Sequence, residues 1–288
     1  MDGLTMLAPD SLRLARKVLL QDPPGISSLA WTPDGLYALA DNLPVLYRFE
    51  LASLTVDWRL SLDPEGAMAP IPKPLKPDFE ASVLIEREGR RYLQAFGSGS
   101  LAGTRELQVS VELASGKIDR TSLASLYAEI GRTIGLEVNI EAAAMLGDTL
   151  LLGNRGHHGQ PANHLLSIVS GSIRRVQRLE LPREPFAGLS GLEYEPDADR
   201  LWLTATTEAT ASVYDDGVIG DSYLAWIDDF SRRFKLDTLF PTGQLNLTQL
   251  DPAFDGQKIE GLALCPDGIW LGSDNDSSEA GLFELCQS

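Results

Sequence analysis

The sequence predicts an all-β fold, a single β-propeller of five blades with about four strands each. Three observations lead to this prediction. A hairpin pattern near the N-terminus, residues 25–42, recurs near the C-terminus in residues 258–276. Three further segments carry the same pattern at intervals of 49 to 70 residues, a period typical of propellers and solenoids. Each hairpin leads into further short runs of β-branched and aromatic residues bounded by Gly, Pro, Asp and Ser, as strands are.

The two terminal hairpins align without a gap when Ile26 is placed on Ile259. They share an apolar Leu-Ala pair, a Pro-Asp-Gly turn and a closing Asp-Asn pair. One difference matters: the first hairpin has Ser27 where the last has Glu260. We call this position the anchor of each repeat. The five anchors are Ser27, Glu80, Glu141, Ser190 and Glu260, in hairpins 25–42, 78–100, 139–156, 188–207 and 258–276.

Four strands per repeat form one propeller blade, and a closed ring of blades leaves no long sheet edge exposed. The fifth repeat ends one strand short, and residues 12–20 are the natural missing strand. We therefore expect residues 1–288 to form one domain, closed by the N-terminal strand in the last blade. Residues 122–135 have a helical pattern and are predicted as an insertion between blades two and three. Six blades are the alternative, if one repeat has diverged beyond recognition.

Composition bounds the class of protein. The 288 residues include 24 basic and 41 acidic side chains, a formal charge of −17, which argues against nucleic acid or an anionic membrane as a partner. No apolar run approaches the roughly 20 residues that span a bilayer. Cys265 and Cys286 do not have the spacing of a metal site. We expect a cytoplasmic monomer that binds a small molecule or a protein at its channel mouth.

The anchors are predicted to meet at one mouth of the central channel, here called the upper mouth. The first strand of each hairpin lines the channel, and antiparallel pairing places residues equidistant from the turn opposite each other. Glu260 is then expected opposite Asp274, and Glu141 opposite Asn154. The predicted metal ligands are Glu80, Glu141, Glu260 and Asp274, and the predicted ligand-binding residues there are Asp41, Asn42, Asn154 and Asn275. The lower mouth receives only the hairpin turns, for which no function is predicted.

Several carboxylates on one narrow ring repel each other. At about 4 Å and an effective dielectric constant near 20, each pair costs on the order of 4 kcal/mol. The repulsion is relieved if the ring binds a cation, if some of its carboxylates are protonated, or if the basic side chains of Arg155, Arg105 or Lys258 pair with them. Hard oxygen ligands favour Ca²⁺ over Zn²⁺. The alternative is a channel filled by water, hydrogen bonds and internal salt bridges.

Two loops above this mouth offer further candidates. His157, His158 and His164 all follow the third hairpin beside Arg155. His157 or His158 is a candidate general base and Arg155 a candidate for holding an anionic substrate, the catalytic set of this prediction. The alternative is a solvated loop.

The other loop, residues 97–106, offers Ser98 and Arg105 as an anion cradle. It lacks the full phosphate-loop pattern with its Lys, so the signal is weak.

The segments "IEGLALCPDGIWLGSDND" and "NIEAAAMLGDTLLLGNRG" resemble bacterial propellers of the group that includes the esterase-like phytases and the gluconolactonase-like proteins. The resemblance implies a divalent metal, usually calcium, at the channel mouth, supporting phosphoester or lactone hydrolysis. Glu80, Glu141 and Glu260 match the Glu of the family's Glu-Gly or Glu-Ala motif, and Asp274 matches the Asp that ends the following strand. In the first blade, Ser27 stands where the gluconolactonase-like proteins carry a metal-binding Glu.

Three functions follow from these features. The favoured one is a propeller of unassigned biochemical role whose acidic mouth binds a divalent cation or a small ligand. The second is a metal-dependent hydrolase of a small anionic ester, phosphoester or lactone. The third is a sugar-processing propeller, which requires a carboxylate pair about 5 Å or about 6.5–9.5 Å apart with room for a sugar ring.

Overall fold

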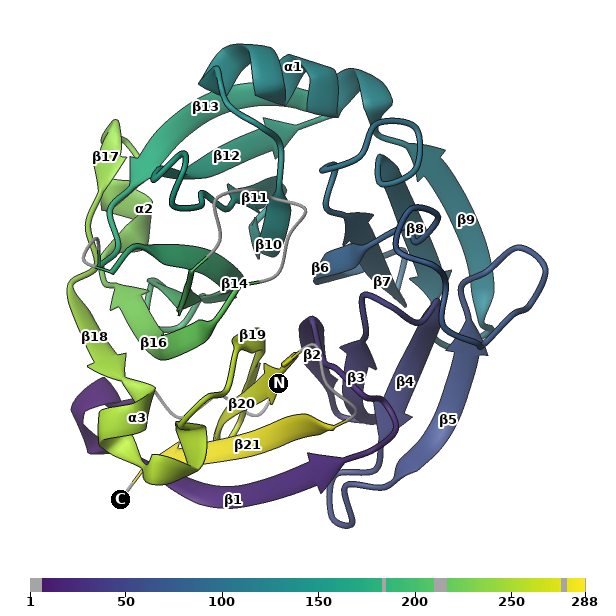
Figure 1. Cartoon of the computed structure of the whole chain (residues 1–288), viewed down its shortest axis with the longest axis horizontal. Helices are drawn as coiled ribbons and strands as arrows, with labels where there is room; N and C mark the ends of the chain where they lie inside the picture. The colour runs from purple at the N-terminus through teal and green to yellow at the C-terminus, as the bar shows by residue number, and fades with distance from the viewer. Residues whose placement is uncertain (1–6, 183–184, 210–216, 276–278, 288) are drawn as a thin grey trace.

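A computed structural model describes residues 7–182, 185–209, 217–275 and 279–287. Five antiparallel sheets stand in a ring around a central axis, as Figure 1 shows from above. The fold is a five-bladed β-propeller, which confirms the predicted fold class and blade count.

Each blade starts with a strand at the channel and adds strands outward. The first blade contains β2 (Ser28–Thr32), β3 (Gly35–Leu39), β4 (Val45–Phe49) and β5 (Val56–Ser61), and the second contains β6 (Phe79–Arg87), β7 (Arg90–Gly97), β8 (Leu107–Glu112) and β9 (Lys117–Ser122). The third contains β10 (Ile140–Leu146), β11 (Thr149–Asn154), β12 (Asn163–Val169) and β13 (Ser172–Leu179), and β17 (Thr238–Leu239) extends it. The fourth contains β14 (Ala187–Glu195), β15 (Arg200–Glu208), β16 (Ile219–Ile227) and β18 (Gly243–Asn246), and the fifth contains β19 (Ile259–Cys265), β20 (Gly268–Ser273), β21 (Ala280–Gln287) and β1 (Leu12–Leu20).

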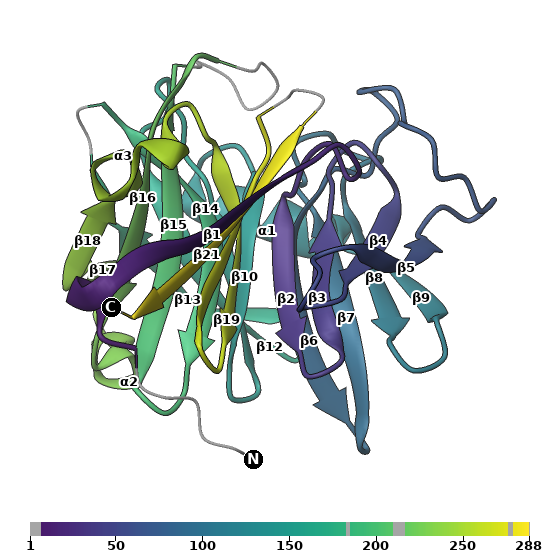
Figure 2. The same ribbon diagram turned by 90° about the horizontal axis from the view of Figure 1, so that it is seen from below.

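The N-terminal strand closes the ring. Strand β1 pairs antiparallel with β21, from Leu12 opposite Gln287 to Leu20 opposite Ala280. Figure 2 shows β1 lying along β21 on the outside of the last blade. The predicted closure is therefore confirmed, and the two ends of the chain hold the same sheet together.

Helices are few and short in the described part of the chain. Helix α1 (Ala124–Ile134) lies between β9 and β10 at the outer rim and buries Tyr127 and Ile130. Single turns form α2 (Phe230–Arg233), α3 (Leu247–Leu250) and the 3₁₀ segments Pro9–Ser11 and Pro252–Phe254. None of these helices is long and apolar enough to cross a membrane.

The buried apolar side chains form five clusters, one between each pair of neighbouring blades. Leu36 and Phe49 of the first blade, for example, pack with Trp270 and Leu282 of the fifth. Inner strands such as β19 are buried along their whole length, because neighbouring blades cover both faces of the sheet. Outer strands such as β1 alternate between more and less exposed side chains. The hydrophobic effect thus holds the blades around the axis.

A β-bulge occurs at four of the five anchors. Phe79 pairs with Gly97 and Ala81 with Phe96, so Glu80 is the extra residue between them. The ladder is shifted in the same way at Glu141, Ser190 and Glu260. The predicted pairing of Glu260 with Asp274, and of Glu141 with Asn154, is therefore wrong: Ile259 pairs with Ser273, and Ile140 with Asn154. Counting from the turn missed the inserted residue, which bends the strand and re-aims its side chain.

We expect Gly191, next to the Ser190 bulge, to tolerate no side chain. A Cβ there would lie 2.5 Å from Thr204 Oγ1 and 2.7 Å from the backbone oxygen of Glu260 in the next blade. Gly191→Ala should lower the free energy of unfolding by about 1–3 kcal/mol, measured by urea denaturation, because the strands must move apart.

Gly131→Ala is the matched control. Its Cβ would only touch Val138 Cγ2 at 3.4 Å in helix α1. It should stabilise by about 0.5–1 kcal/mol, since Ala loses less backbone entropy in a helix. A Gly191→Ala protein as stable as the parent would contradict this account of blade packing.

Candidate functional site

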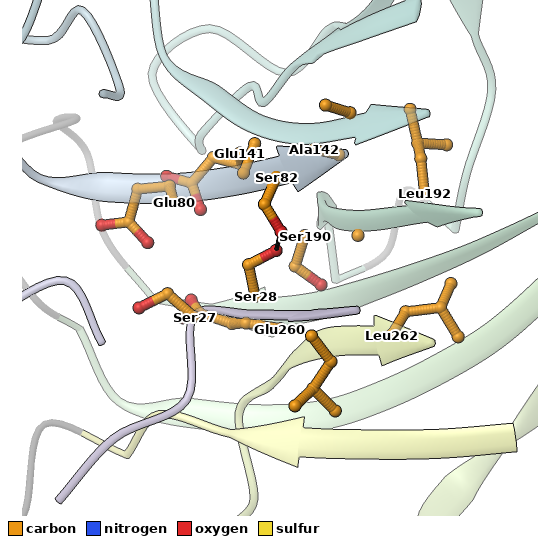
Figure 3. Close-up of a pocket in the computed structure, with 14 residues that line it drawn as sticks. Ser27, Ser28, Glu80, Ser82, Glu141, Ala142, Ser190, Leu192, Glu260 and Leu262 are labelled. Atoms are coloured by element: carbon orange, nitrogen blue, oxygen red, sulfur yellow. Dashed lines mark hydrogen bonds between the residues drawn. The ribbon is translucent and has the colours of Figure 1, made fainter. Parts of the chain in front are cut away.

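All five anchors line one small cavity in the channel. Figure 3 shows Glu80 and Glu141 side by side, with Ser27, Ser190 and Glu260 facing them. The cavity has a volume of about 10 Å³. This is the space of roughly one water molecule or one ion.

Three of the anchors bring carboxylates together. One oxygen from each of Glu80, Glu141 and Glu260 lies within 4.8 Å of the other two. Glu80 also belongs to a second group, with Asp41 and Asp78, that meets the same limit. Glu80 therefore stands between two carboxylate clusters.

Arg155 and Lys258 neutralise one side of the ring. Arg155 Nη1 lies 3.2 Å from Glu141 Oε2 and 3.7 Å from Glu260 Oε1, and Nη2 lies 2.8 Å from Glu208 Oε2. The ammonium of Lys258 lies 3.0 Å from Glu260 Oε1. Arg155 thus ties the third, fourth and fifth blades together through buried ion pairs.

Asp78 is the centre of a second network. Lys76 forms ion pairs with Asp41 and with Asp78, the latter at 2.9 Å. Arg105 Nη1 lies 2.6 Å from Asp78 Oδ2, and Ser98 donates its hydroxyl to the same oxygen. The polar groups of Ser98 and Arg105, predicted as an anion cradle, contact this carboxylate. Their predicted role in ligand binding stays a prediction.

Glu80 differs from the other carboxylates of the site. Within the described ranges, no hydrogen bond or ion pair reaches its side chain, whereas Asn139 Nδ2 donates to Glu141 Oε1 at 2.7 Å. Among the residues that the structure describes, the upper mouth gathers seven carboxylates against four basic side chains. The carboxylates are those of Asp41, Asp78, Glu80, Glu141, Glu208, Glu260 and Asp274, and the basic side chains are those of Lys76, Arg105, Arg155 and Lys258. The carboxylates thus outnumber the basic side chains, and Glu80 is the carboxylate without a basic partner among the described residues.

The protonation equilibria reflect this crowding. Burial raises the pKa of Glu80 well above its ordinary range, and the carboxylates of Asp78 and Glu141 raise it further. Burial also raises the pKa of Glu260, although Lys258 opposes the shift. Burial alone would lower the pKa of Lys258, but the charges of Glu260, Glu208 and Glu141 together outweigh it and the pKa is raised. The basic groups stay charged, and the carboxylates compete for protons.

Arg155, Asp274 and Ser98 hold equivalent positions in their blades. Each donates its backbone N–H to the carbonyl two residues before the anchor, at 2.8 Å, 3.0 Å and 2.8 Å. The carboxylate of Asp274 faces the first blade, where Ser27 Oγ donates to it at 3.4 Å. Asp274 belongs to neither group of three carboxylates found among the described residues, although its charge acts on Glu260.

The predicted asparagines brace the chain beside the mouth. Asn154 Oδ1 accepts the N–H of Asn139 at 2.8 Å, and Asn275 Oδ1 accepts the N–H of Lys258 at 2.9 Å. Asn42 differs, because its buried Oδ1 has no hydrogen-bond partner within the described residues. Asn154 and Asn275 thus fix the backbone just before the inner strands. Of these three asparagines, Asn42 is the one with an unused acceptor among the described residues.

The histidines lie outside the carboxylate ring. His157 Nε2 lies 3.4 Å from a carboxylate oxygen of Glu137, and its Nδ1 accepts the N–H of Gly159. His158 is exposed and packs edge-on against Phe186. His164 lies in β12, where burial and Arg178 lower its pKa. The contacts of His157 and His158 give no support to the catalytic role predicted for them, which stays a prediction.

Sequence reasoning missed Lys76, Asp78, Asn139 and Glu208. Asp78, Asn139 and Lys258 each stand two residues before an anchor, and equivalent positions of the repeat come to the same mouth of the channel. That spacing would have found Asp78 and Asn139. Lys76 lies in an irregular segment and Glu208 at the far end of β15, so no local pattern identifies them.

The chain belongs to a family of unknown function, DUF6929, whose match covers residues 24–286. No curated protein matches it. Glutaminyl cyclase of Myxococcus xanthus is similar in structure, with 12% identity, 95% of each chain covered and a TM-score of 0.56. The major allergen Mala s 1 of Malassezia sympodialis is also similar in structure, with 11% identity, 96% of each chain covered and a TM-score of 0.51. These likenesses extend to the propeller fold alone and do not single out the phytase or gluconolactonase group.

We expect Arg155 to be essential to the stability of this site. Arg155→Met keeps much of the side-chain volume and removes the charge that Glu141, Glu208 and Glu260 share. Breaking such buried pairs should cost about 3–5 kcal/mol of unfolding free energy in urea, because the carboxylates are left uncompensated.

Arg174→Met, at an exposed position of β13, is the control and should change stability by less than about 0.5 kcal/mol. Equal stability of the two variants would show that Arg155 is not what neutralises the ring.

Proposed function

We propose that the upper mouth of this propeller binds one hard divalent cation, Ca²⁺ in the first place, through Glu80, Glu141 and Glu260. The observation that carries the proposal is the position of Glu80: a carboxylate without ion pair or hydrogen bond in the described part of the chain, beside two further carboxylates. A cation between them would satisfy all three.

Ligand chemistry favours calcium. Ca²⁺ takes oxygen ligands in flexible geometry, whereas Mg²⁺ demands near-ideal octahedral geometry and usually keeps several waters. Three carboxylate oxygens within 4.8 Å of one another, in a channel with little space for water, suit the more tolerant ion. The cavity of about 10 Å³ has room for one ion and for no organic molecule.

Charge supports the same proposal. The four basic side chains leave part of the acidic charge at this mouth unbalanced. Burial, and after it the neighbouring carboxylates, raise the pKa values of Glu80 and Glu260. A divalent cation replaces protons there. Since Glu80, Glu141 and Glu260 start strands of the second, third and fifth blades, the ion would also tie these blades together.

Binding is favoured over catalysis. A hydrolase of the phytase-like or gluconolactonase-like kind needs a substrate beside the metal and a group that moves a proton. The cavity admits no substrate beside the glutamates, and His157 contacts Glu137 instead. The function best supported is that of a binding protein whose propeller is stabilised by a cation. Its ligand or partner approaches the upper mouth from outside.

The test compares the metal content and thermal stability of the purified protein and of Glu80→Gln. Calcium should raise the melting temperature of EDTA-treated parent protein, since a ligand at 100 times its Kd adds about 2.7 kcal/mol to folding. Glu80→Gln should lose the shift, because an amide keeps the shape and removes the charge.

Glu129→Gln, at an exposed position of α1, should keep the full calcium shift, and magnesium should give a smaller one. A parent protein that contains no calcium and melts at the same temperature in millimolar calcium and in EDTA would refute the proposal.

A further inference from the structure

The lower half of the channel contains a second cavity that differs in character from the first. It has a volume of about 210 Å³ and lies between the level of the anchors and the hairpin turns. Four residues after each anchor, every blade contributes a large apolar side chain to its wall. These side chains are Trp31, Leu84, Met145, Tyr194 and Leu264. The first four of them are only half-buried: each packs against the edge of a blade junction and also borders this space.

One carboxylate interrupts this apolar wall. Three residues after the anchor, four blades carry the small apolar residues Ala30, Val83, Ala144 and Ala263, and the fourth blade carries Glu193. No hydrogen bond or ion pair reaches Glu193 from the described residues. The repeat therefore departs from its own pattern at one position, and the departure places an acid among the apolar side chains of this wall.

Glu193 is the group in this wall that titrates near neutral pH. Burial raises its pKa to about 8, with no charged neighbour contributing. Tyr194, the other titratable residue of the wall, donates its hydroxyl to Asp199 Oδ1 at 2.9 Å, and burial raises its pKa to about 12. A carboxyl without partners in such a wall is unfavourable by itself, and a cationic donor would complement it.

We propose that the lower cavity binds a small organic amine, with its ammonium on Glu193 and its apolar body against Trp31 and Tyr194. Aromatic faces attract ammonium groups in addition to apolar surface. A metal ion would not suit the site, because Ca²⁺ requires six to eight oxygen ligands and the wall offers one carboxylate. This site is separate from the cation site proposed above.

The volume bounds the size of the amine. A cavity of about 150 Å³ holds benzene in another protein, and drug-sized ligands need about 300–1,000 Å³. About 210 Å³ accommodates one ring with a short aminoalkyl arm. 2-Phenylethylamine and cyclohexylamine are therefore suitable probes, and 2-phenylethanol is the neutral analogue of the first.

Amine binding should depend on pH, because it is linked to the loss of the Glu193 proton. Below about pH 8, the neutral acid and an ammonium ion combine to form a carboxylate–ammonium pair, and one proton is released to the solvent. Affinity should therefore rise about tenfold per pH unit up to about pH 8. It should then stay level until the amine itself loses its proton near pH 10.

The experiment is isothermal titration of the full chain with the two amines and 2-phenylethanol at pH 8 and pH 6. We expect saturable binding of at least one amine with a Kd below about 1 mM at pH 8, at least tenfold weaker binding at pH 6, and weaker binding of the alcohol. Glu193→Gln should bind the amine at least tenfold more weakly. Glu86→Gln, at an exposed position of β6 in the second blade, should bind it as the parent does and so measures adsorption to the acidic surface.

Glu193→Gln should fold, because an amide is neutral like the protonated acid, and circular dichroism checks this. The proposal is overturned if neither amine binds saturably to the parent at pH 8. It is also overturned if Glu193→Gln binds as tightly as the parent, or if the alcohol binds as tightly as the amine.

Discussion

The convergence of five inner strands on one narrow axis is the constraint on which the rest of this structure depends. A bulge at Glu80, Glu141, Ser190 and Glu260 turns these four side chains, near the beginnings of their strands, toward that axis. Three of these side chains are acidic, so ring closure itself forces carboxylates together in a buried space. Much of the chemistry at the upper mouth is a response to this repulsion.

The response is uneven around the ring. Arg155 and Lys258 compensate Glu141 and Glu260, and Lys76 and Arg105 compensate Asp41 and Asp78. Glu80 lies between the two networks, and within the described residues neither one reaches it by an ion pair. Internal salt bridges thus fill most of the site, and three carboxylates remain that could hold a cation.

The sequence was sufficient for the ring and the convergence of the anchors, because both depend on repetition. The hairpin at Ile26 and Ile259 repeats visibly, and equivalent positions in a propeller must meet at the same level of the channel. The sequence was not sufficient to predict the pairing register of the inner strands, because a bulge adds one residue without a compositional signal. It also missed Lys76 and Glu208, which reach the site from non-equivalent positions. Glu193 was accessible in principle, as the one charged residue in a row of Ala and Val.

Crystals of the protein soaked in a lanthanide that replaces Ca²⁺ would test the central claim most directly, through an anomalous difference map. The account predicts one strong peak in the upper channel, with oxygens of Glu80, Glu141 and Glu260 at calcium-like distances of about 2.3–2.6 Å. An empty channel with Glu80 paired to a basic side chain, or a peak only on the outer surface, would contradict it.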